Sequence, residues 1–375
     1  MKKILIAMPS LTSANGVARV IMNYSDELIL NGYQIDYLIV SDENMDQLYY
    51  KKIINNKSKI FVIPKNNKKN RFSIVKKYVD EILKKNNYDF VHVNLVDLYA
   101  LAILVSSKKN NVPRRIYHIH NPNSGTTQLR TVIKKIFNKL CINNSNVFFA
   151  CSELAANSML KGKKYKIIRN VINVPSFKFD IEKREYIRKK YNIEEDMIVI
   201  GTVARIEEQK NPFFMADIIK EMIQIDSKII WLYIGDGTLR ELLEKYVFDL
   251  GIKKNVIFVG STEFVNEFYS SMDIFVLPSK FEGLGMSYIE AQSNGMPVYA
   301  SDCVPKDIKI TDLVTFLSLK DLPQKWAEII YNNGLKKVEE RKKYNIEVIN
   351  NGYDIDKQKD NEYSLLYNYE IMGGK

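Results

Sequence analysis

The feature that most constrains the fold of this chain is an alternation between short apolar runs and longer helical segments, which begins anew near the middle of the sequence. The apolar runs have the length of buried β-strands, and the segments between them have the spacing of helices. In the first half the predicted strands are residues 3–8, 34–40, 60–63, 90–94, 115–120 and 147–150, and predicted helices such as 17–30, 73–85 and 98–108 lie between them. This alternation predicts a mostly parallel sheet with helices on both faces.

The same pattern returns in the second half, and 375 residues are enough for two hydrophobic cores. Its predicted strands are residues 197–203, 229–234, 256–259, 274–277 and 297–301, and its predicted helices include 212–224, 238–249 and one that ends at Gly295. We therefore expect an α/β chain with two doubly wound domains facing across a cleft, residues 1–174 and 175–345. A helical tail, residues 346–375, is expected to return to the first domain. In open α/β sheets, ligands bind beyond the carboxyl ends of the strands.

Cysteine usage and the N-terminal residues bear on the compartment. Cys141, Cys151 and Cys303 form no CxxC pair, which argues against a disulfide framework and against a zinc ribbon. The apolar run at residues 3–8 is too short for a signal peptide and is followed by turn-forming residues. No stretch approaches the roughly 20 apolar residues of a membrane span. A cytoplasmic protein is expected.

The net charge of +11 is unevenly distributed along the chain. Residues 1–175 carry 28 Lys and Arg against 11 Asp and Glu, whereas residues 176–375 carry 27 against 33. A lysine-rich genome would raise both halves alike, so the asymmetry favours a basic face that meets an anionic partner. No nucleic-acid-binding signature is present. The basic clusters 65–71 and 161–166 instead suit an anionic membrane surface, where each nearby cation contributes about 1 kcal/mol.

The segment 278–291 follows a predicted strand and opens a predicted helix. It places two carboxylates, Glu282 and Glu290, around two glycines, Gly283 and Gly285. Glycines let the backbone approach a ligand closely, and free N–H groups at a helix start attract anions and hydroxyls. A carboxylate can accept two hydrogen bonds from a vicinal diol such as ribose. The alternative is a helix whose acidic residues only complement its dipole.

The segment 201–212 also leads from a predicted strand into a predicted helix. Arg205 and Lys210 are then expected at the carboxyl edge of the sheet, where both can pair with a diphosphate. A solvated basic loop is the alternative. Such charge neutralisation stabilises a leaving nucleoside diphosphate whether or not a metal is present.

The chain has three histidines, and two of them alternate on one predicted strand. His118 and His120 therefore share a face, and His120 stands at the carboxyl end. His120 is the first candidate, His118 the second, and His92 ranks lower. No Asp-x-Asp pair follows a strand, since Asp354 and Asp356 lie in the polar tail, so no metal site is predicted.

Taken together, segments 201–212, 235–237, 255–260, 278–291 and 290–298 resemble the donor domain of family-4 retaining glycosyltransferases of the GT-B fold. Residues 301–302 and 311–319 are most similar to the capsular and exopolysaccharide branch. The first loop departs from the family by reading Asn15-Gly16-Val17-Ala18-Arg19 where a Gly pair is common. Residues 170–173 depart as well.

The resemblance implies a role for each matching residue. Arg205 and Lys210 would bind the donor diphosphate, Glu290 the ribose, and Glu282 and His120 the donor sugar. Further donor contacts are implied for Gly16, Val259, Gly260, Gly283, Leu284 and Gly285, with Glu263 near the base. His120, Glu282, Arg205 and Lys210 would thus form the catalytic set.

The function that this resemblance implies is transfer of a sugar from a nucleotide donor, by family habit a UDP-sugar. The acceptor would be a lipid-linked oligosaccharide or polysaccharide at the inner face of the membrane. The anomeric configuration would be retained, and neither a metal nor another cofactor would be needed. A nucleotide-sugar epimerase of similar fold and a basic nucleic-acid-binding protein are the alternatives. A dinucleotide oxidoreductase is disfavoured because the first loop lacks GxGxxG.

Overall fold

The computed structural model describes residues 1–12, 16–40, 45, 47–63, 70–120, 128–262, 264–333 and 338–358. These described residues form two compact units, which divide between Asn170 and Val171, and residues 346–357 group with the second unit. The expected domain boundary lies after residue 174. Residues 359–375 lie outside the described residues, so the return of the tail to the first domain stays a prediction.

The first unit is built on a parallel sheet with the strand order β3-β2-β1-β4-β5-β6-β7. Its strands are β1 (Lys3–Met8), β2 (Gln34–Ile39), β3 (Ile60–Val62), β4 (Phe90–Val93), β5 (Arg114–Ile119), β6 (Val147–Ala150) and β7 (Lys166–Ile167). Its helices are α1 (Gly16–Leu30), α2 (Gln47–Asn55), α3 (Arg71–Lys85), α4 (Leu98–Lys109), α5 (Gln128–Asn144) and α6 (Glu153–Met159).

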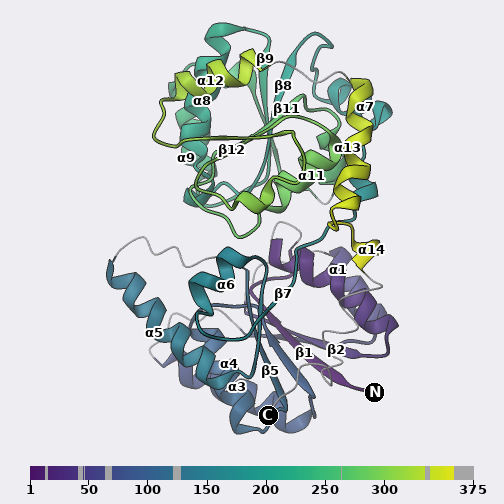
Figure 1. The fold of residues 1–375 in the computed structure, drawn as a ribbon, viewed down its shortest axis with the longest axis vertical. Helices are drawn as coiled ribbons and strands as arrows, with labels where there is room; N and C mark the ends of the chain where they lie inside the picture. Colours follow the sequence, from purple (N-terminus) through teal and green to yellow (C-terminus); the bar gives the residue numbers. More distant parts are fainter. Residues whose placement is uncertain are drawn as a thin grey trace. The chain divides into compact units, whose positions relative to one another are not determined.

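The strand order of this sheet reverses between β1 and β4. Because crossovers between parallel strands are right-handed, a reversal places the helices before and after it on opposite faces. Figure 1 shows α1 on one side of the sheet and the α3–α4 pair on the other. Side chains of β1 such as Leu5 and Ala7 are fully buried as a result, and their core continues into α3 and α4.

The second unit repeats this plan with the strand order β10-β9-β8-β11-β12-β13. Its strands are β8 (Ile198–Val203), β9 (Ile229–Ile234), β10 (Val256–Gly260), β11 (Ile274–Leu277), β12 (Val298–Ser301) and β13 (Val314–Leu317). Its α-helices are α7 (Ile181–Lys190), α8 (Pro212–Ile225), α9 (Arg240–Asp249), α10 (Val265–Tyr269), α11 (Met286–Asn294), α12 (Pro323–Asn332), α13 (Val338–Asn350) and α14 (Ile355–Gln358). Short 3₁₀ turns are η1 (Val174–Phe177), η2 (Glu208–Lys210), η3 (Lys253–Asn255) and η4 (Lys306–Ile308).

The order of this sheet reverses between β8 and β11, which are hydrogen-bonded neighbours. The prediction of two doubly wound α/β sheets is therefore confirmed. Helix α8 starts at Pro212, and α11 ends at Asn294 with Gly295 as its C-cap, as the sequence predicts. In the described part of the chain, no helix is long and apolar enough to cross a membrane.

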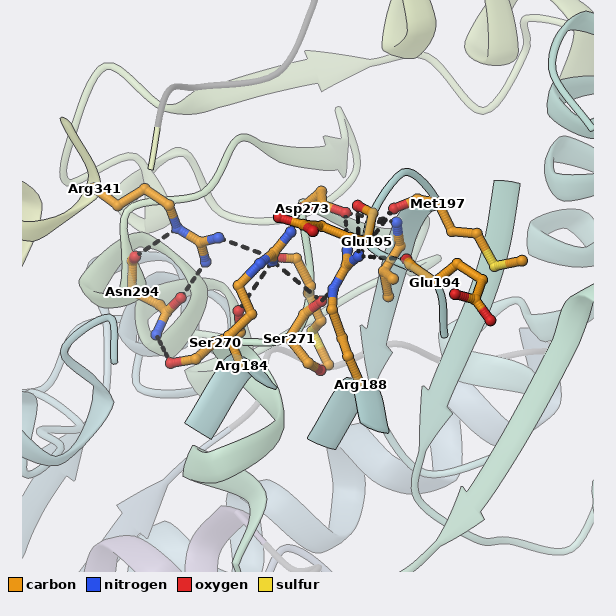
Figure 2. A network of polar contacts seen from close by, with 12 residues as sticks. Arg184, Arg188, Glu194, Glu195, Met197, Ser270, Ser271, Asp273, Asn294 and Arg341 are labelled. Carbon is orange, nitrogen blue, oxygen red and sulfur yellow. Dashed lines mark hydrogen bonds and ion pairs between the residues drawn. The ribbon is translucent and has the colours of Figure 1, made fainter. Parts of the chain in front are cut away.

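A largely buried polar network fixes α7 to the second sheet (Figure 2). Asp273, just before β11, accepts hydrogen bonds from Arg184 and Arg188 of α7, each at 2.7 Å. The backbone N–H of Val199 in β8 donates to the same carboxylate at 2.7 Å. One carboxylate thus pairs with two guanidinium groups and ties a helix to two neighbouring strands.

Replacing this carboxylate should destabilise the second unit strongly. Asp273→Asn leaves Arg184 and Arg188 without their counter-charge, and breaking a buried ion pair typically costs about 3 kcal/mol or more. Urea unfolding followed by tryptophan fluorescence measures the change, since Trp231 and Trp326 both lie in the core of this unit. Asp196→Asn is the matched control because Asp196 pairs with Lys228 at the surface. Equal unfolding midpoints for both variants would contradict the network's structural role.

Candidate active site

Two loops of the second unit carry the residues that the sequence singles out. One follows β8 and contains Arg205 and Lys210, and the other follows β11 and contains Glu282 and Gly285. Because β8 and β11 are parallel neighbours at the point where the strand order reverses, both loops leave the same edge of the sheet side by side. This is the place where open α/β sheets bind ligands.

Glu282 is the centre of the contacts between the two loops. Its Oε1 accepts hydrogen bonds from Lys210 Nζ at 2.5 Å and from Ser279 Oγ at 2.7 Å. Its Oε2 accepts one from Gln209 Nε2 at 3.2 Å, and the side chain is only 5% exposed. The predicted residues Lys210 and Glu282 therefore lie together, and their opposite charges neutralise each other.

The loop after β8 is also held by its backbone. Gln209 O accepts a hydrogen bond from Lys280 N at 2.8 Å, which fixes the loop to the one after β11. On its other side, Ile206 N donates to Asp236 O at 3.0 Å. A Cβ on Gly235 would lie 2.0 Å from Ala204 O, so only glycine allows this approach. Arg205 itself is exposed at this edge.

The loop after β11 turns into α11 at Gly285. Gly285 has a positive φ of 67°, and a Cβ there would lie 2.6 Å from the ring of Tyr288. A larger residue would therefore be strained at the helix start for both reasons. Gly283 and Leu284, which precede it, are buried. This conformation brings the first turn of α11 to the same edge as Glu282.

Glu290 lies one turn further along α11 and is completely buried. Its Oε2 accepts a hydrogen bond from Tyr269 Oη at 2.7 Å. Figure 2 shows the neighbouring end of α11 with Asn294. The structure thus holds Glu290 within the protein, with its carboxylate directed to Tyr269.

The remaining candidates occupy several places. Val259 and Gly260 end β10 and are partly exposed, and Gly260 O accepts a hydrogen bond from Gly235 N at 2.9 Å. Gly16 is the exposed first residue of α1, in the first unit. Glu263 lies outside the described residues.

The three histidines of the chain form one buried cluster at the carboxyl ends of β4 and β5. His92 Nε2 lies 3.1 Å from His118 Nδ1, and the rings of His118 and His120 have centroids 4.0 Å apart. His120 Nε2 lies 2.8 Å from Asn94 Oδ1. Since Asn94 Nδ2 donates to Ala7 O, the amide is oriented with Oδ1 as the acceptor, so His120 Nε2 carries the proton. The shared face predicted for His118 and His120 is confirmed.

Burial governs the charge of this cluster. It lowers the pKa of His92 and of His120 to about 3, and the neighbouring imidazole of His120 adds to the shift for His92. The pKa of His118 is also lowered well below its usual value, first by burial and then by the two neighbouring imidazoles. All three rings are therefore neutral at physiological pH and can accept or donate single hydrogen bonds.

Several site residues were not singled out as candidates by the sequence. Gln209, Ser279, Tyr269 and Asn94 each hydrogen-bond to a predicted site residue. Gln209 and Ser279 lie within the two singled-out loops, whereas Tyr269 and Asn94 lie outside every such segment. Asn94 follows the end of β4, and that position could have drawn attention to it, but Tyr269 ends helix α10 and has no such signal. Among the residues that the structure describes, no group of three or more His, Cys, Asp or Glu side chains could hold a metal ion.

The buried histidines should make stability fall in acid. Their folded-state pKa lies below the unfolded value, so their full contribution is present above about pH 6.5 and is lost as the pH falls towards 3. As the pH falls from 7.5 to 5.5, each buried histidine should lower the free energy of unfolding by about 1.4 kcal/mol. The stability deficit of His92→Gln, measured by urea unfolding, should therefore shrink by about 1.4 kcal/mol over this range. The deficit of Ser107→Ala, another buried polar site, should stay constant.

If the deficit of His92→Gln were also independent of pH, the folded chain would hold a protonated cluster, and the low pKa values would be wrong.

Both halves of the chain match known family models. Residues 183–325 match the model described as glycosyl transferases group 1, and residues 14–174 match the model described as Glycosyltransferase Family 4. The first range lies in the second unit and contains all the candidates at the strand reversal. The second range contains Gly16 and the three histidines.

Individual proteins and structures are similar over most of the chain. EpsF of Bacillus subtilis, which is named as a glycosyltransferase, is 25% identical over 84% of this chain and 83% of its own length. An Escherichia coli enzyme named UDP-Gal:alpha-D-GlcNAc-diphosphoundecaprenol alpha-1,3-galactosyltransferase is 25% identical over 64% of this chain and 67% of its own. The crystal structure of Anabaena HepE in complex with UDP and glucose superposes with a TM-score of 0.77 at 15% identity, covering 98% of this chain and 99% of that one. Two successive family models and a shared two-sheet architecture thus show that the chain is an enzyme and belongs to the glycosyltransferases of the GT-B fold.

Proposed function

We propose that this enzyme transfers a hexosyl group from a UDP-sugar to a lipid-linked saccharide and retains the anomeric configuration. The product would be a growing capsular or exopolysaccharide unit at the inner face of the cell membrane. The observation that carries the proposal is the meeting of the two loops at the reversal between β8 and β11. There Lys210 and Glu282 already lie together, and Arg205 stands exposed at the same edge.

The similar proteins support the choice of donor and acceptor. HepE is described in complex with UDP and with glucose, and also with UDP-glucose. The Escherichia coli relative is named for a UDP-galactose donor and a diphosphoundecaprenol-linked acceptor. A lipid-linked diphosphate acceptor would require this enzyme to work beside a membrane.

The chemistry assigned to the site is neutralisation of a leaving diphosphate. Arg205 offers a planar guanidinium for two phosphate oxygens, and Lys210 offers a compact charge. Binding of the diphosphate would draw Lys210 from Glu282, and the carboxylate would then be free to accept hydroxyls of the donor sugar. Ser279 and Gln209 keep it in place during this exchange. These cations and the start of α11 would meet the charge without a metal.

His120 is assigned a contact with a sugar hydroxyl. His120 Nε2–H donates to Asn94 Oδ1, so Nδ1 is the atom that can accept a hydrogen bond from a hydroxyl. Nδ1 is buried, so this contact needs a local movement of the residues beside it. Retention would follow a front-face path in which the leaving phosphate takes the acceptor proton, so no protein nucleophile is assigned.

Helix α5 supports contact with an anionic membrane. Ile133, Ile136 and Leu140 lie on one face of this helix and are 44%, 56% and 41% exposed, which is unusual for large apolar side chains. Lys135 and Lys139 are exposed beside them. The surrounding residues 98–152 contain eight Lys and Arg and no Asp or Glu. An apolar stripe flanked by lysines is typical of helices that lie in the membrane interface.

The donor is tested by nucleotide binding. UDP, GDP and ADP and their glucose conjugates are added to wild type and to Glu282→Gln, with and without EDTA, and thermal shifts are recorded. A ligand at 100 times its Kd stabilises the folded state by about 2.7 kcal/mol. We expect a shift with UDP and UDP-sugar that EDTA leaves unchanged, with Glu282→Gln losing the added shift of the sugar but keeping that of UDP.

The outcomes separate the alternatives. A thermal shift that EDTA abolishes would contradict metal independence. A shift with GDP or ADP but not with UDP would overturn the assignment of a UDP-sugar as the donor. Turnover of UDP-sugar to its epimer without any acceptor would overturn the assignment of transferase activity. The anomeric configuration of the product, read from its proton NMR coupling constant, tests retention.

Membrane contact is tested by flotation with vesicles of phosphatidylcholine alone and with 30% phosphatidylglycerol. Wild type should bind the anionic vesicles, and the double variant Ile133→Asn/Ile136→Asn should lose roughly tenfold or more in affinity because two apolar side chains no longer insert. Leu242→Asn on α9 is the control, since Leu242 is equally apolar and 58% exposed. Binding that is independent of phosphatidylglycerol, or unaffected in the double variant, would refute the role of α5.

A further inference from the structure

We infer that Tyr269 is a positioning residue: it holds the Glu290 carboxylate for the ribose of the donor and thereby sets the preference for a ribonucleotide. The inference deepens the proposed function and depends on the role assigned there to Glu290. It names a residue outside every motif of the sequence, and it makes a prediction about one hydroxyl group of the ligand.

The contact between the two side chains is short and buried. Tyr269 Oη donates to Glu290 Oε2 at 2.7 Å, and neither side chain has any solvent-exposed surface. A hydrogen bond to an ionised acceptor away from water is stronger and more directional than one at the surface. A carboxylate has about four acceptor sites, so one carboxylate can accept hydrogen bonds from a phenol and from ribose hydroxyls together.

The tyrosine is itself held rigidly. Its ring lies edge-on to Phe177 with centroids 5.5 Å apart and packs beside Phe275 of β11 at 6.1 Å. Both neighbours are buried core residues of the second unit. This packing restricts the position of the phenol oxygen. The hydrogen bond from Tyr269 therefore orients the Glu290 carboxylate.

The backbone on either side of the contact is held by one side chain, Arg341 of α13, whose bonds to Asn294 are drawn in Figure 2. Its Nη2 donates to Tyr269 O at 3.4 Å and its Nη1 to Met272 O at 2.9 Å, which holds the end of α10. Its Nε donates to Asn294 O at 3.2 Å, which holds the end of α11. A single buried guanidinium thus fixes the spacing between the helix of Tyr269 and the helix of Glu290.

The consequence concerns the ribose 2′-hydroxyl. A site built to bind a hydroxyl discriminates against the analogue that lacks it, because a buried group then stays unpaired. If Tyr269 orients the Glu290 carboxylate, loss of the phenol oxygen lets this carboxylate rotate away from the ribose. Affinity for the ribonucleotide then falls, whereas affinity for the 2′-deoxynucleotide, which makes no such bond, hardly changes.

The test measures Kd for UDP and for 2′-deoxy-UDP by isothermal titration calorimetry. Wild type should prefer UDP by about 10- to 100-fold, the value of one or two hydrogen bonds to a charged group. Tyr269→Phe keeps the ring and its packing, and its preference should fall to roughly threefold, with the Kd of 2′-deoxy-UDP within about twofold of wild type. Glu290→Gln should lose the preference to a similar extent.

The matched control is Tyr288→Phe. Tyr288 is also fully buried and lies on α11, but its hydroxyl donates to Leu277 O at 2.8 Å and not to Glu290. This variant loses a buried hydrogen bond of the same kind and should keep the wild-type preference for UDP. Circular dichroism melting curves of all variants identify any that do not fold.

The outcomes separate this inference from the proposed function. If Tyr269→Phe keeps the wild-type preference for UDP and Glu290→Gln loses it, the positioning role of Tyr269 is overturned. The contact between Glu290 and the ribose would then still stand. An unchanged preference in Glu290→Gln would overturn both. Loss of the preference in Tyr288→Phe as well would show a general effect of loosening α11, and the role of Tyr269 would then be rejected. Should UDP not bind, the same pairs of GDP and ADP are measured, and failure of all three overturns both assignments.

Discussion

Hydrogen bonding between β8 and β11 is the constraint on which the candidate site depends. Parallel strands end at the same edge of a sheet, and a reversal of strand order leaves the loops of two neighbouring strands without a crossover helix between them. The loops that carry Lys210 and Glu282 can therefore touch. In a sheet with any other strand between them, the 2.5 Å contact between these two side chains could not form.

Two carboxylates of the second unit are largely buried where several partners satisfy them. Asp273 receives two guanidinium groups and a backbone N–H, and Glu282 receives an ammonium, a hydroxyl and an amide. Burying a charge without such partners is costly, so each cluster also fixes the elements that supply the donors. The histidines of the first unit avoid this cost in another way, because their imidazoles are buried in the neutral form.

Much of the fold is predictable because parallel strands covered on both faces are read as nearly continuous apolar runs. The ends of β1 and the stop of α11 at Gly295 fall where the sequence places them. The same holds for the loop positions of Arg205, Lys210, Glu282 and Gly285. Tyr269 and Arg341 could not be predicted in this way. Each acts on α11 across a long sequence separation, and neither the spacing nor the composition around it differs from that of an ordinary helix.

The sequence by itself determined the class of fold, the two-sheet plan and the loops that carry the candidate residues, because these follow from local periodicity and turn chemistry. Only the tertiary structure decided which side chains meet. It paired Lys210 with Glu282, turned Glu290 inward to Tyr269 and gathered three histidines into a neutral cluster. Such pairings depend on strand order and on packing between distant segments, and the chain encodes both only through the free energy of the whole fold.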